Sequence, residues 1–256
     1  MQSSPWRIDG HTARLEAETF RIEIDLLNPS AGVRCLEVRG MALHDAALFC
    51  VMLPQSSSAG GTPVDFFSRG NDLVAVYGEA REHPFRAQIY WRLLPSLQFE
   101  AADKKTQPIA ALELILSIQT SLLDSDPALM VETALAANEV SQLAGIDDCR
   151  LVDLIVSGLP ERADAKLGAG CFVFRPVSAG SIYIEMVHPA DFRQSTLERV
   201  EQNGPVRLSH RLFAERLEKG VILRSRIRGI IAADANPAAI ARSYQEFAAS
   251  DPPLTA

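Results

Sequence analysis

The chain has 256 residues and a formal net charge of −7; 47% of its residues are hydrophobic and 22% are charged. This composition is typical of a soluble globular protein with a sizeable core, and the length fits one large β domain or two smaller ones. The basic residues are spread along the chain, which argues against a nucleic-acid-binding protein, because such proteins concentrate positive charge to displace counterions from phosphates.

The cysteines and the N-terminus exclude further classes. Neither a C-x-x-C spacing nor a nearby histidine pair accompanies the four cysteines, so we expect no metal site, no disulfide framework and no cofactor, and we interpret these residues as buried, reduced thiols. They are Cys35, Cys50, Cys149 and Cys171. Residues 1–10 lack the basic start and apolar run of a signal peptide, and no apolar segment reaches the roughly 20 residues of a membrane-spanning helix. We expect a cytoplasmic protein without a membrane partner, unless a leader was removed.

In the first half of the chain, apolar and polar residues alternate with a period of two, which predicts β-strands. FRIEIDLL (20–27) and GVRCLEVRG (32–40) show this alternation, and the continuously apolar ALFCVMLP (47–54) is typical of a strand buried on both faces. QSSSAGG (55–61) resembles a linker, but the strand pattern resumes at once, so we interpret it as a long loop.

Two later strands have strongly polar sides. FRAQIYWRLL (85–94) places Trp91 and other apolar residues on one side, and LELILSIQTS (112–121) alternates in the same way. The polar sides are Arg86, Gln88, Tyr90 and Arg92 on the first strand, and Glu113, Ser117 and Gln119 on the second.

The second half predicts two hairpins, an ambiguous segment and one helix. DPALMVETALAANEVSQLAG (126–145) has helical propensity but also alternates, and we favour strand. Hairpins are predicted over 171–189 and over 211–232, the latter turning at Lys219-Gly220 and placing Arg224, Arg226 and Arg228 on one side. At the C-terminus, Asn236 can cap a short amphipathic helix that begins at Pro237. The elements predict a single all-β domain, residues 1–256, folded as a sandwich or barrel.

The polar strand sides have two interpretations. They can be the solvated outer face of a sandwich, which is the general expectation for alternating strands. They can also line a concave sheet that holds a polar ligand. A sugar suits such a surface, because its hydroxyl groups pair with Arg, Asn, Asp and Gln side chains and its C–H faces pack on aromatic rings. The arginine row would favour an acidic sugar.

Three stretches resemble the galactose-mutarotase-like, or aldose-epimerase-like, group of proteins. They are SRGNDLVAVY (68–77), HPFRAQIYW (83–91) and LFAERLEKGVILRSRIRGII (212–231), within a strand rhythm that covers the whole length. The resemblance implies a large antiparallel two-sheet supersandwich. It also implies a sugar site with an early arginine, two histidines and a late glutamate, in which the glutamate is the base and a histidine the acid of ring opening. Arg69, His83, His188 and Glu215 match these positions.

Each candidate also has a structural interpretation. His83 and His188 precede prolines, so we place both at strand ends or turns, where a histidine can be catalytic or simply exposed. Arg69, Asn71 and Asp72 can form a binding loop or an ordinary turn, with Arg69 paired to Asp72 or Asp65. Glu215 is expected on a strand, where a salt bridge is its alternative role.

We therefore predict a carbohydrate-binding protein of the aldose-epimerase-like type. Interconversion of sugar anomers by acid–base chemistry is the activity that the resemblance implies. The alternative is a non-catalytic binding or assembly module, and no H-E-x-x-H or G-x-S-x-G motif supports a hydrolase. The partner is a small sugar or glycan, and the sequence does not indicate an oligomeric state. The catalytic candidates are His83, His188 and Glu215, and the substrate-binding candidates are Arg69, Asn71, Asp72, Arg86, Gln88, Tyr90 and Arg226.

Overall fold

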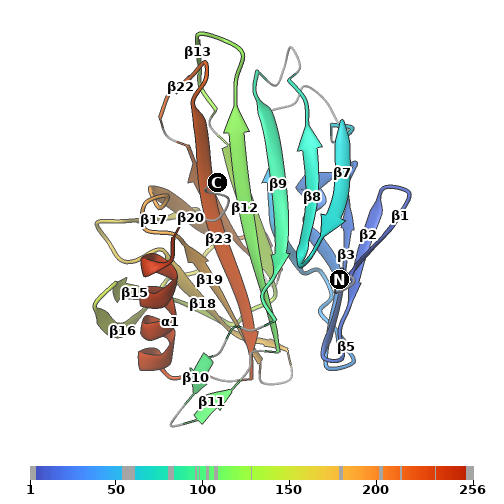
Figure 1. Ribbon diagram of the computed structural model, residues 1–256. Helices are drawn as coiled ribbons and strands as arrows, with labels where there is room; N and C mark the ends of the chain where they lie inside the picture. Colours follow the sequence, from blue (N-terminus) through green and yellow to red (C-terminus); the bar gives the residue numbers. More distant parts are fainter. Residues whose placement is uncertain are drawn as a thin grey trace.

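The computed structural model describes residues 4–53, 61–79, 84–95, 97, 99–101, 104–106, 109–127, 129–178, 181–201, 204–213, 215–233 and 235–251. Two large antiparallel sheets make up most of this part of the chain, as Figure 1 shows. The predicted all-β class is confirmed. No helix within these ranges is long and apolar enough to span a bilayer.

The first sheet has ten strands and contains the N-terminal strands. In order across it lie β1 (Trp6–Asp9), β2 (Thr12–Glu16), β3 (Phe20–Asp25), β4 (Val33–Val38), β6 (Ala47–Met52), β14 (Leu129–Leu135), β21 (Val206–Leu212), β20 (Gln194–Arg199) and β17 (Glu161–Asp164), with β5 (Met41–Ala42) paired to β4. A 3₁₀ turn at Pro29–Ala31 precedes β4. The continuously apolar strand β6 is buried along nearly all of its length, as predicted.

The second sheet has nine strands and contains the polar rows that the sequence singled out. In order across it lie β16 (Asp148–Asp153), β15 (Glu139–Gly145), β18 (Cys171–Ser178), β19 (Ser181–Val187), β23 (Ile222–Ala232), β12 (Ala110–Gln119), β9 (Arg86–Leu93), β8 (Asp72–Tyr77) and β7 (Asp65–Arg69). Two small two-stranded sheets pair β10 (Phe99–Ala101) with β11 (Lys104–Thr106) and β13 (Asp124–Ser125) with β22 (Leu217–Glu218).

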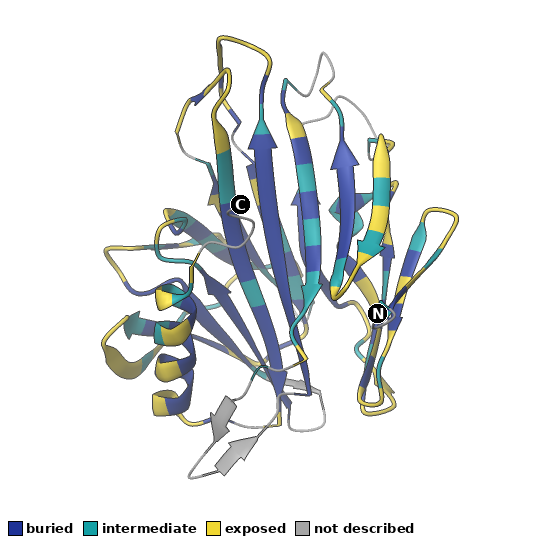
Figure 2. Ribbon diagram, viewed as in Figure 1, coloured by how far each residue is buried: buried dark blue, intermediate teal, exposed yellow. Residues whose placement is uncertain are grey.

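The main core lies between the two large sheets. The apolar sides of β9, β12 and β23 contribute Trp91, Leu114 and Ile227, which form one buried cluster with Val131 and Leu208 of the first sheet. Removing these side chains from water is the main favourable contribution to the packing of one sheet on the other. Figure 2 shows that β12 is buried over almost its full length.

One helix, α1 (Pro237–Ala249), packs on the outer face of the second sheet, over β18 and β19 in Figure 1. The Asn236 side chain accepts a hydrogen bond from the Ala239 amide, and Pro237 occupies the first turn, as predicted. Ile240, Tyr244 and Phe247 are the buried stripe of the helix, and they meet Ile184, Met186 and Ile230 of the sheet. The outer face of this sheet is therefore apolar under the helix and polar beside it.

Most of the predicted elements are confirmed. The hairpin over 171–189 is β18 paired with β19, and the ambiguous segment 126–145 forms strands β14 and β15. The predicted loop over 55–61 lies outside the described residues, apart from Gly61. Burial is correctly predicted for Cys50 and Cys171 and wrong for Cys35 and Cys149, which are exposed.

The predicted hairpin over 211–232 is wrong. A turn does occur at Lys219-Gly220, where Gly220 has a φ of 85°, but the two arms do not pair. β21 pairs with β14 and β20 in the first sheet, whereas β23 pairs with β12 and β19 in the second. The connection therefore crosses from one sheet to the other, because each arm finds longer ladders with other strands.

Candidate functional site

The polar sides of three strands, β9, β12 and β23, lie next to one another on one face of the second sheet, although the strands are far apart in the sequence. The strand register aligns Arg92 with Glu113 and Glu113 with Arg228, so the outward side chains of β9, β12 and β23 form continuous cross-strand rows. We call this surface the polar face. Its members are Asp72 on β8, Arg86, Gln88, Tyr90 and Arg92 on β9, Glu113, Ser117 and Gln119 on β12, and Arg224, Arg226 and Arg228 on β23.

One cross-strand row of the polar face, which we call the lower row, consists of Asp72, Arg92, Glu113 and Arg228. Its charges alternate in sign across four neighbouring strands. Asp72 on β8 accepts two hydrogen bonds from Arg92, at 2.7 and 2.8 Å. Glu113 on β12 accepts two from Arg228, at 3.0 and 2.7 Å. These charge-assisted bonds hold the side chains in fixed geometry, and the bond to Asp72 raises the pKa of Arg92. Opposite charges on facing strands also offset the repulsion among the arginines.

A cavity of about 490 Å³ opens at this row. Arg69 and Asn71, at the β7–β8 turn, line it together with Asp72, Arg92 and Arg228. Its remaining lining includes the apolar side chains of Leu94 and Leu97. A volume of this size lies within the range of small-molecule sites, about 300–1,000 Å³.

The turn that supplies Arg69 and Asn71 is anchored to the first sheet. The Trp6 indole Nε1 donates a hydrogen bond to the Asn71 carbonyl oxygen at 3.0 Å. Neither of the two local pairings that the turn interpretation allowed, Arg69 with Asp72 or with Asp65, occurs among the ion pairs of the described residues, and Asp72 is bonded to Arg92 instead. Arg69 has no ion pair within the described ranges and is exposed, so its guanidinium is available at the cavity.

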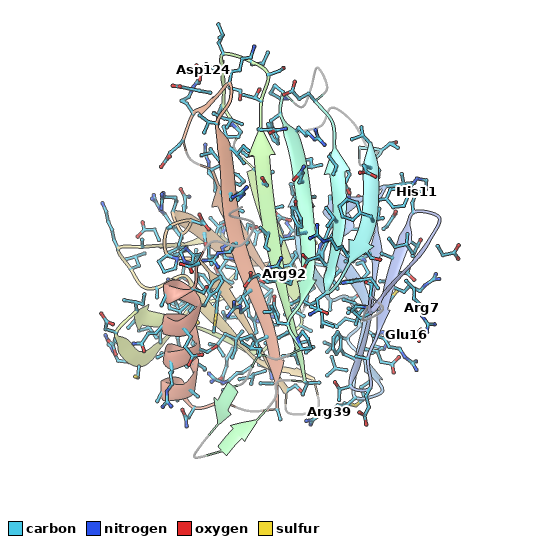
Figure 3. All side chains as sticks on the ribbon, viewed as in Figure 1. Arg7, His11, Glu16, Arg39, Arg92 and Asp124 are labelled. Carbon is cyan, nitrogen blue, oxygen red and sulfur yellow. The ribbon has the colours of Figure 1, made fainter. Side chains whose placement is uncertain are left out.

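The other candidates of strand β9 lie farther along the polar face. Tyr90 is partly buried and its hydroxyl donates to Gln88 Oε1 at 2.9 Å, while Arg86 is exposed. Burial raises the pKa of the Tyr90 phenol. These three residues share the face of the cavity but do not line it. Arg92, which does, is labelled on this face in Figure 3.

Arg226 and His188 lie at the C-terminal end of helix α1. Arg226 is buried and donates to Ser250 Oγ and to the carbonyl oxygens of Ser250 and Asp251, at 3.0–3.1 Å. His188 Nε2 lies 3.2 Å from the Ala248 carbonyl oxygen, and its ring packs edge-on against Phe247. Burial lowers the pKa of the His188 imidazole, and the charge of Arg226 lowers it further. Both side chains therefore hold the end of the helix on the sheet.

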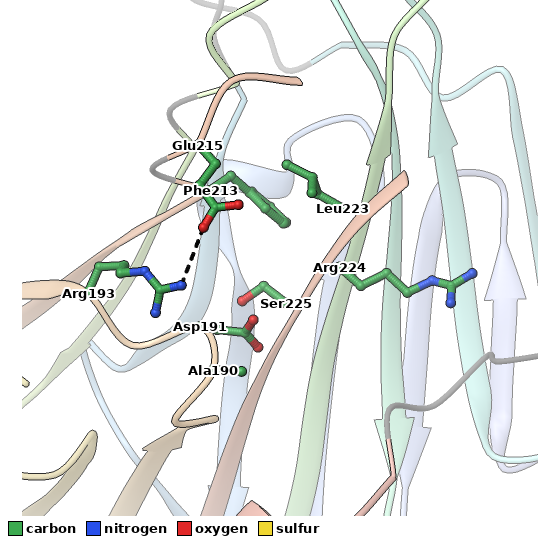
Figure 4. A pocket seen from close by; sticks show the side chains of 8 residues that line it. All are labelled: Ala190, Asp191, Arg193, Phe213, Glu215, Leu223, Arg224 and Ser225. Atoms are coloured by element: carbon green, nitrogen blue, oxygen red, sulfur yellow. Dashed lines mark ion pairs between the residues drawn. The ribbon is translucent and has the colours of Figure 1, made fainter. Parts of the chain in front are cut away.

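Glu215 lies in a different place from the other candidates. It is not on a strand, contrary to the prediction, but between β21 and β22, where its exposed carboxylate lies 3.6 Å from Arg193. Both residues line a small cavity of about 110 Å³ with Asp191 and Ser225. Figure 4 shows that the Arg224 side chain extends to the opposite side of β23 from Glu215. His83 lies outside the described residues.

Sequence reasoning missed a buried polar network between the two sheets. Glu185 on β19 accepts hydrogen bonds from Thr133 (2.6 Å) and Tyr183 (2.5 Å), and it lies 2.8 Å from His210 Nε2. His210 Nδ1 lies 2.6 Å from Ser195 Oγ. The signal was available in SIYIEMVHP, where alternation places Glu185 on the same side as Tyr183 in an otherwise apolar strand.

Comparisons of sequence identify no relatives: no family model matches the chain, and no curated protein matches it. The fold, in contrast, is similar to many solved structures. A protein of Escherichia coli K12 named as a candidate aldose 1-epimerase has a TM-score of 0.59 at 10% identity, over 85% of this chain and 97% of that one. A galactose mutarotase-like protein from Lactobacillus casei has a TM-score of 0.53 at 8% identity, over 86% of this chain and 99% of that one.

The same fold also matches part of a larger enzyme. An α-N-acetylgalactosaminidase from Bifidobacterium bifidum has a TM-score of 0.51 at 11% identity, over 94% of this chain and 38% of that one. Identities this low establish the arrangement of the strands and not the activity. The expected architecture is confirmed, and the chain has the galactose-mutarotase-like fold, which occurs in carbohydrate-processing proteins.

Proposed function

We propose that this chain binds a sugar in the cavity at the lower row of the polar face. The observation that supports the proposal most is the convergence of Arg69, Asn71 and Asp72 with Arg92 and Arg228 around one space of about 490 Å³. Guanidinium, amide and carboxylate groups together offer the donors and acceptors that neighbouring hydroxyl groups of a sugar require. The apolar Leu94 and Leu97 suit the C–H face of a sugar ring.

An acidic sugar fits the charge of the cavity better than a neutral one. Asp72 offsets Arg92, and Glu113 offsets Arg228, through hydrogen-bonded ion pairs. Arg69 adds a positive charge that has no such partner within the described ranges. A guanidinium binds a carboxylate through two parallel hydrogen bonds, so Arg69 is the group that we expect to select a carboxylate on the sugar.

The binding proposal is tested by thermal shift and calorimetry with galactose, glucose and the corresponding uronic acids. A ligand that binds only the folded chain raises the midpoint of unfolding, so at least one of these sugars should do so. Arg69→Gln should weaken binding of the uronic acid by about tenfold, because one charge-assisted contact is lost. Arg211→Gln is the control, since Arg211 is exposed on β21 of the other sheet. If none of these sugars raises the midpoint of unfolding, the proposal is contradicted.

Interconversion of anomers is the second candidate. Its support is the fold, which the chain shares with proteins named as a candidate aldose 1-epimerase and a galactose mutarotase-like protein. His188 adds little support, because its Nδ1 accepts a hydrogen bond from the Ala190 amide and its Nε2 lies 3.2 Å from the Ala248 carbonyl oxygen. Glu215 gives it less support, because its carboxylate lies on the other side of β23 and pairs with Arg193. NMR saturation exchange on the same sugars tests the activity. Anomer exchange rates equal to those in buffer would remove it and leave binding as the function.

A further inference from the structure

The arginines of the polar face differ in whether they have a partner. Arg92 and Arg228 are bonded to carboxylates, and Arg226 is bonded to Ser250 and Asp251, which directly follow α1. Arg224 has neither an ion pair nor a hydrogen bond to any residue that the structure describes, and its Nε atom is buried. Buried polar groups nearly always have a partner, so this one indicates a missing contact.

Arg224 lies among other side chains whose hydrogen-bonding capacity is only partly used. The strand register aligns it with Ser117 and Gln88 in one cross-strand row. The Tyr90 hydroxyl donates to the side-chain oxygen Oε1 of Gln88, which leaves the N–H groups of the Gln88 side chain available for a ligand. Tyr90 is close enough to Arg224 for the guanidinium charge to lower the phenol pKa, against the larger effect of burial. We call Gln88, Tyr90, Ser117 and Arg224 the Arg224 cluster.

The Arg224 cluster and the cavity lie at different positions along strand β23. Arg228 lines the cavity, and Arg224 lies four residues before it on the same strand. With a rise of about 3.3 Å per residue, the two positions are about 13 Å apart. A span of this length between two backbone positions fits a ligand of at least two linked sugar units.

We propose that the polar face binds an acidic oligosaccharide built of uronic acids, with one unit in the cavity and the carboxylate of a later unit on Arg224. This inference rests on the proposed function. The carboxylate would bond to the two terminal nitrogens of the Arg224 guanidinium, in the two-bonded geometry that a guanidinium favours, because the buried Nε is out of reach of a ligand. Tyr90 lies on β9 in the row between Arg228 and Arg224. On β23 this row is Arg226, which is covered by Ser250 and Asp251, so the connecting sugar would pass over the β9 side, where the Tyr90 ring can pack against its C–H face.

Calorimetry with galacturonic acid and its dimer and trimer tests this chain-length effect, with neutral galactose oligomers of equal length beside them. The acidic trimer should bind at least about tenfold more tightly than the acidic monomer, because a second charge-assisted contact is added. The neutral oligomers should show little gain with length.

The ratio of trimer to monomer affinity identifies the residue responsible. Arg224→Gln should reduce this ratio to about one, and Arg224→Lys should keep part of it, since lysine retains the charge without the planar fork. Arg211→Gln on the other sheet should keep the full ratio. Urea unfolding of each variant confirms that it is folded. If Arg224→Gln does not fold, the reduced ratio in Arg224→Lys tests the role of Arg224 in its place.

The outcomes separate this inference from the proposed function. Equal affinities for monomer and trimer, or a length effect that survives in Arg224→Gln, overturn the oligosaccharide inference while sugar binding stands. If neither monomers nor oligomers bind, the proposed function fails and this inference fails with it.

Discussion

Phe247 shows how one side chain separates residues that look equivalent in the sequence. Its ring centroid lies 5.2 Å from the Arg226 guanidinium, 4.4 Å from that of Arg228 and 5.5 Å from the His188 ring. Contacts of this type between a cation and a ring are each worth about 0.5–1 kcal/mol at exposed sites and more where water is excluded. The ring therefore helps to fix Arg228 beside the cavity. Its contact with Arg226 helps to hold helix α1 on the sheet.

The pKa of His188 gives a prediction about pH. Burial and the charge of Arg226 lower this pKa below the ordinary value of 6.5, so on acidification the unfolded chain takes up the proton first. The contribution of His188 to stability is therefore complete above about pH 6.5 and is lost as the pH falls through the lower, folded value. Urea unfolding between pH 8 and 5 should show a steeper loss of stability in the wild type than in His188→Gln. Parallel curves would contradict this effect.

Helix α1 shows how an element can be predicted while its role is not. Its start is local chemistry, since Asn236 and Pro237 are adjacent in the sequence and need no tertiary contact to favour a first turn. Its docking depends on strands distant in the sequence, because Phe247 and Tyr244 pack on β18, β19 and β23. The C-terminal end of the helix then meets Arg226, which could not be foreseen from the alternation of β23.

Removal of the helix cap should destabilise the protein. Asn236→Ala should lower the free energy of unfolding by about 1 kcal/mol, because the Ala239 amide loses its acceptor. Asn236→Asp should keep most of the stability, since aspartate also accepts this hydrogen bond and suits the positive end of the helix dipole. Chemical denaturation measures both variants. Equal destabilisation by alanine and aspartate would show that the cap does not act through this hydrogen bond.

In the molecule as a whole, the two sheets are joined by more than apolar packing. Glu185 comes from the second sheet, whereas Thr133, Ser195 and His210 come from the first. All four are at most 1% exposed. A buried polar network of this kind is unfavourable unless every member is bonded, and these distances of 2.6–2.8 Å satisfy that condition.

Disruption of the network should therefore be costly. His210→Leu should destabilise the fold by about 3 kcal/mol or more, because the Glu185 carboxylate loses its imidazole partner inside the core. Ser195→Ala removes only the outer hydrogen bond and should cost about 1 kcal/mol. His11→Leu, at an exposed turn, is the control and should change stability by less than about 0.5 kcal/mol. A loss in His210→Leu no larger than in Ser195→Ala would contradict the role of the buried pair.

The sequence by itself determined the strands, the capped helix and the division of each strand into an apolar and a polar side. These features depend on the period of two and on contacts between near neighbours, both of which are written in the chain. Only the tertiary structure decided that the polar sides of β9, β12 and β23 form one face, and that the arms over 211–232 belong to different sheets. It also decided that Arg226 binds Ser250 and Asp251, while Arg224 has no partner among the described residues. Alternation specifies the side to which a residue points, whereas strand pairing between distant segments specifies what it meets there.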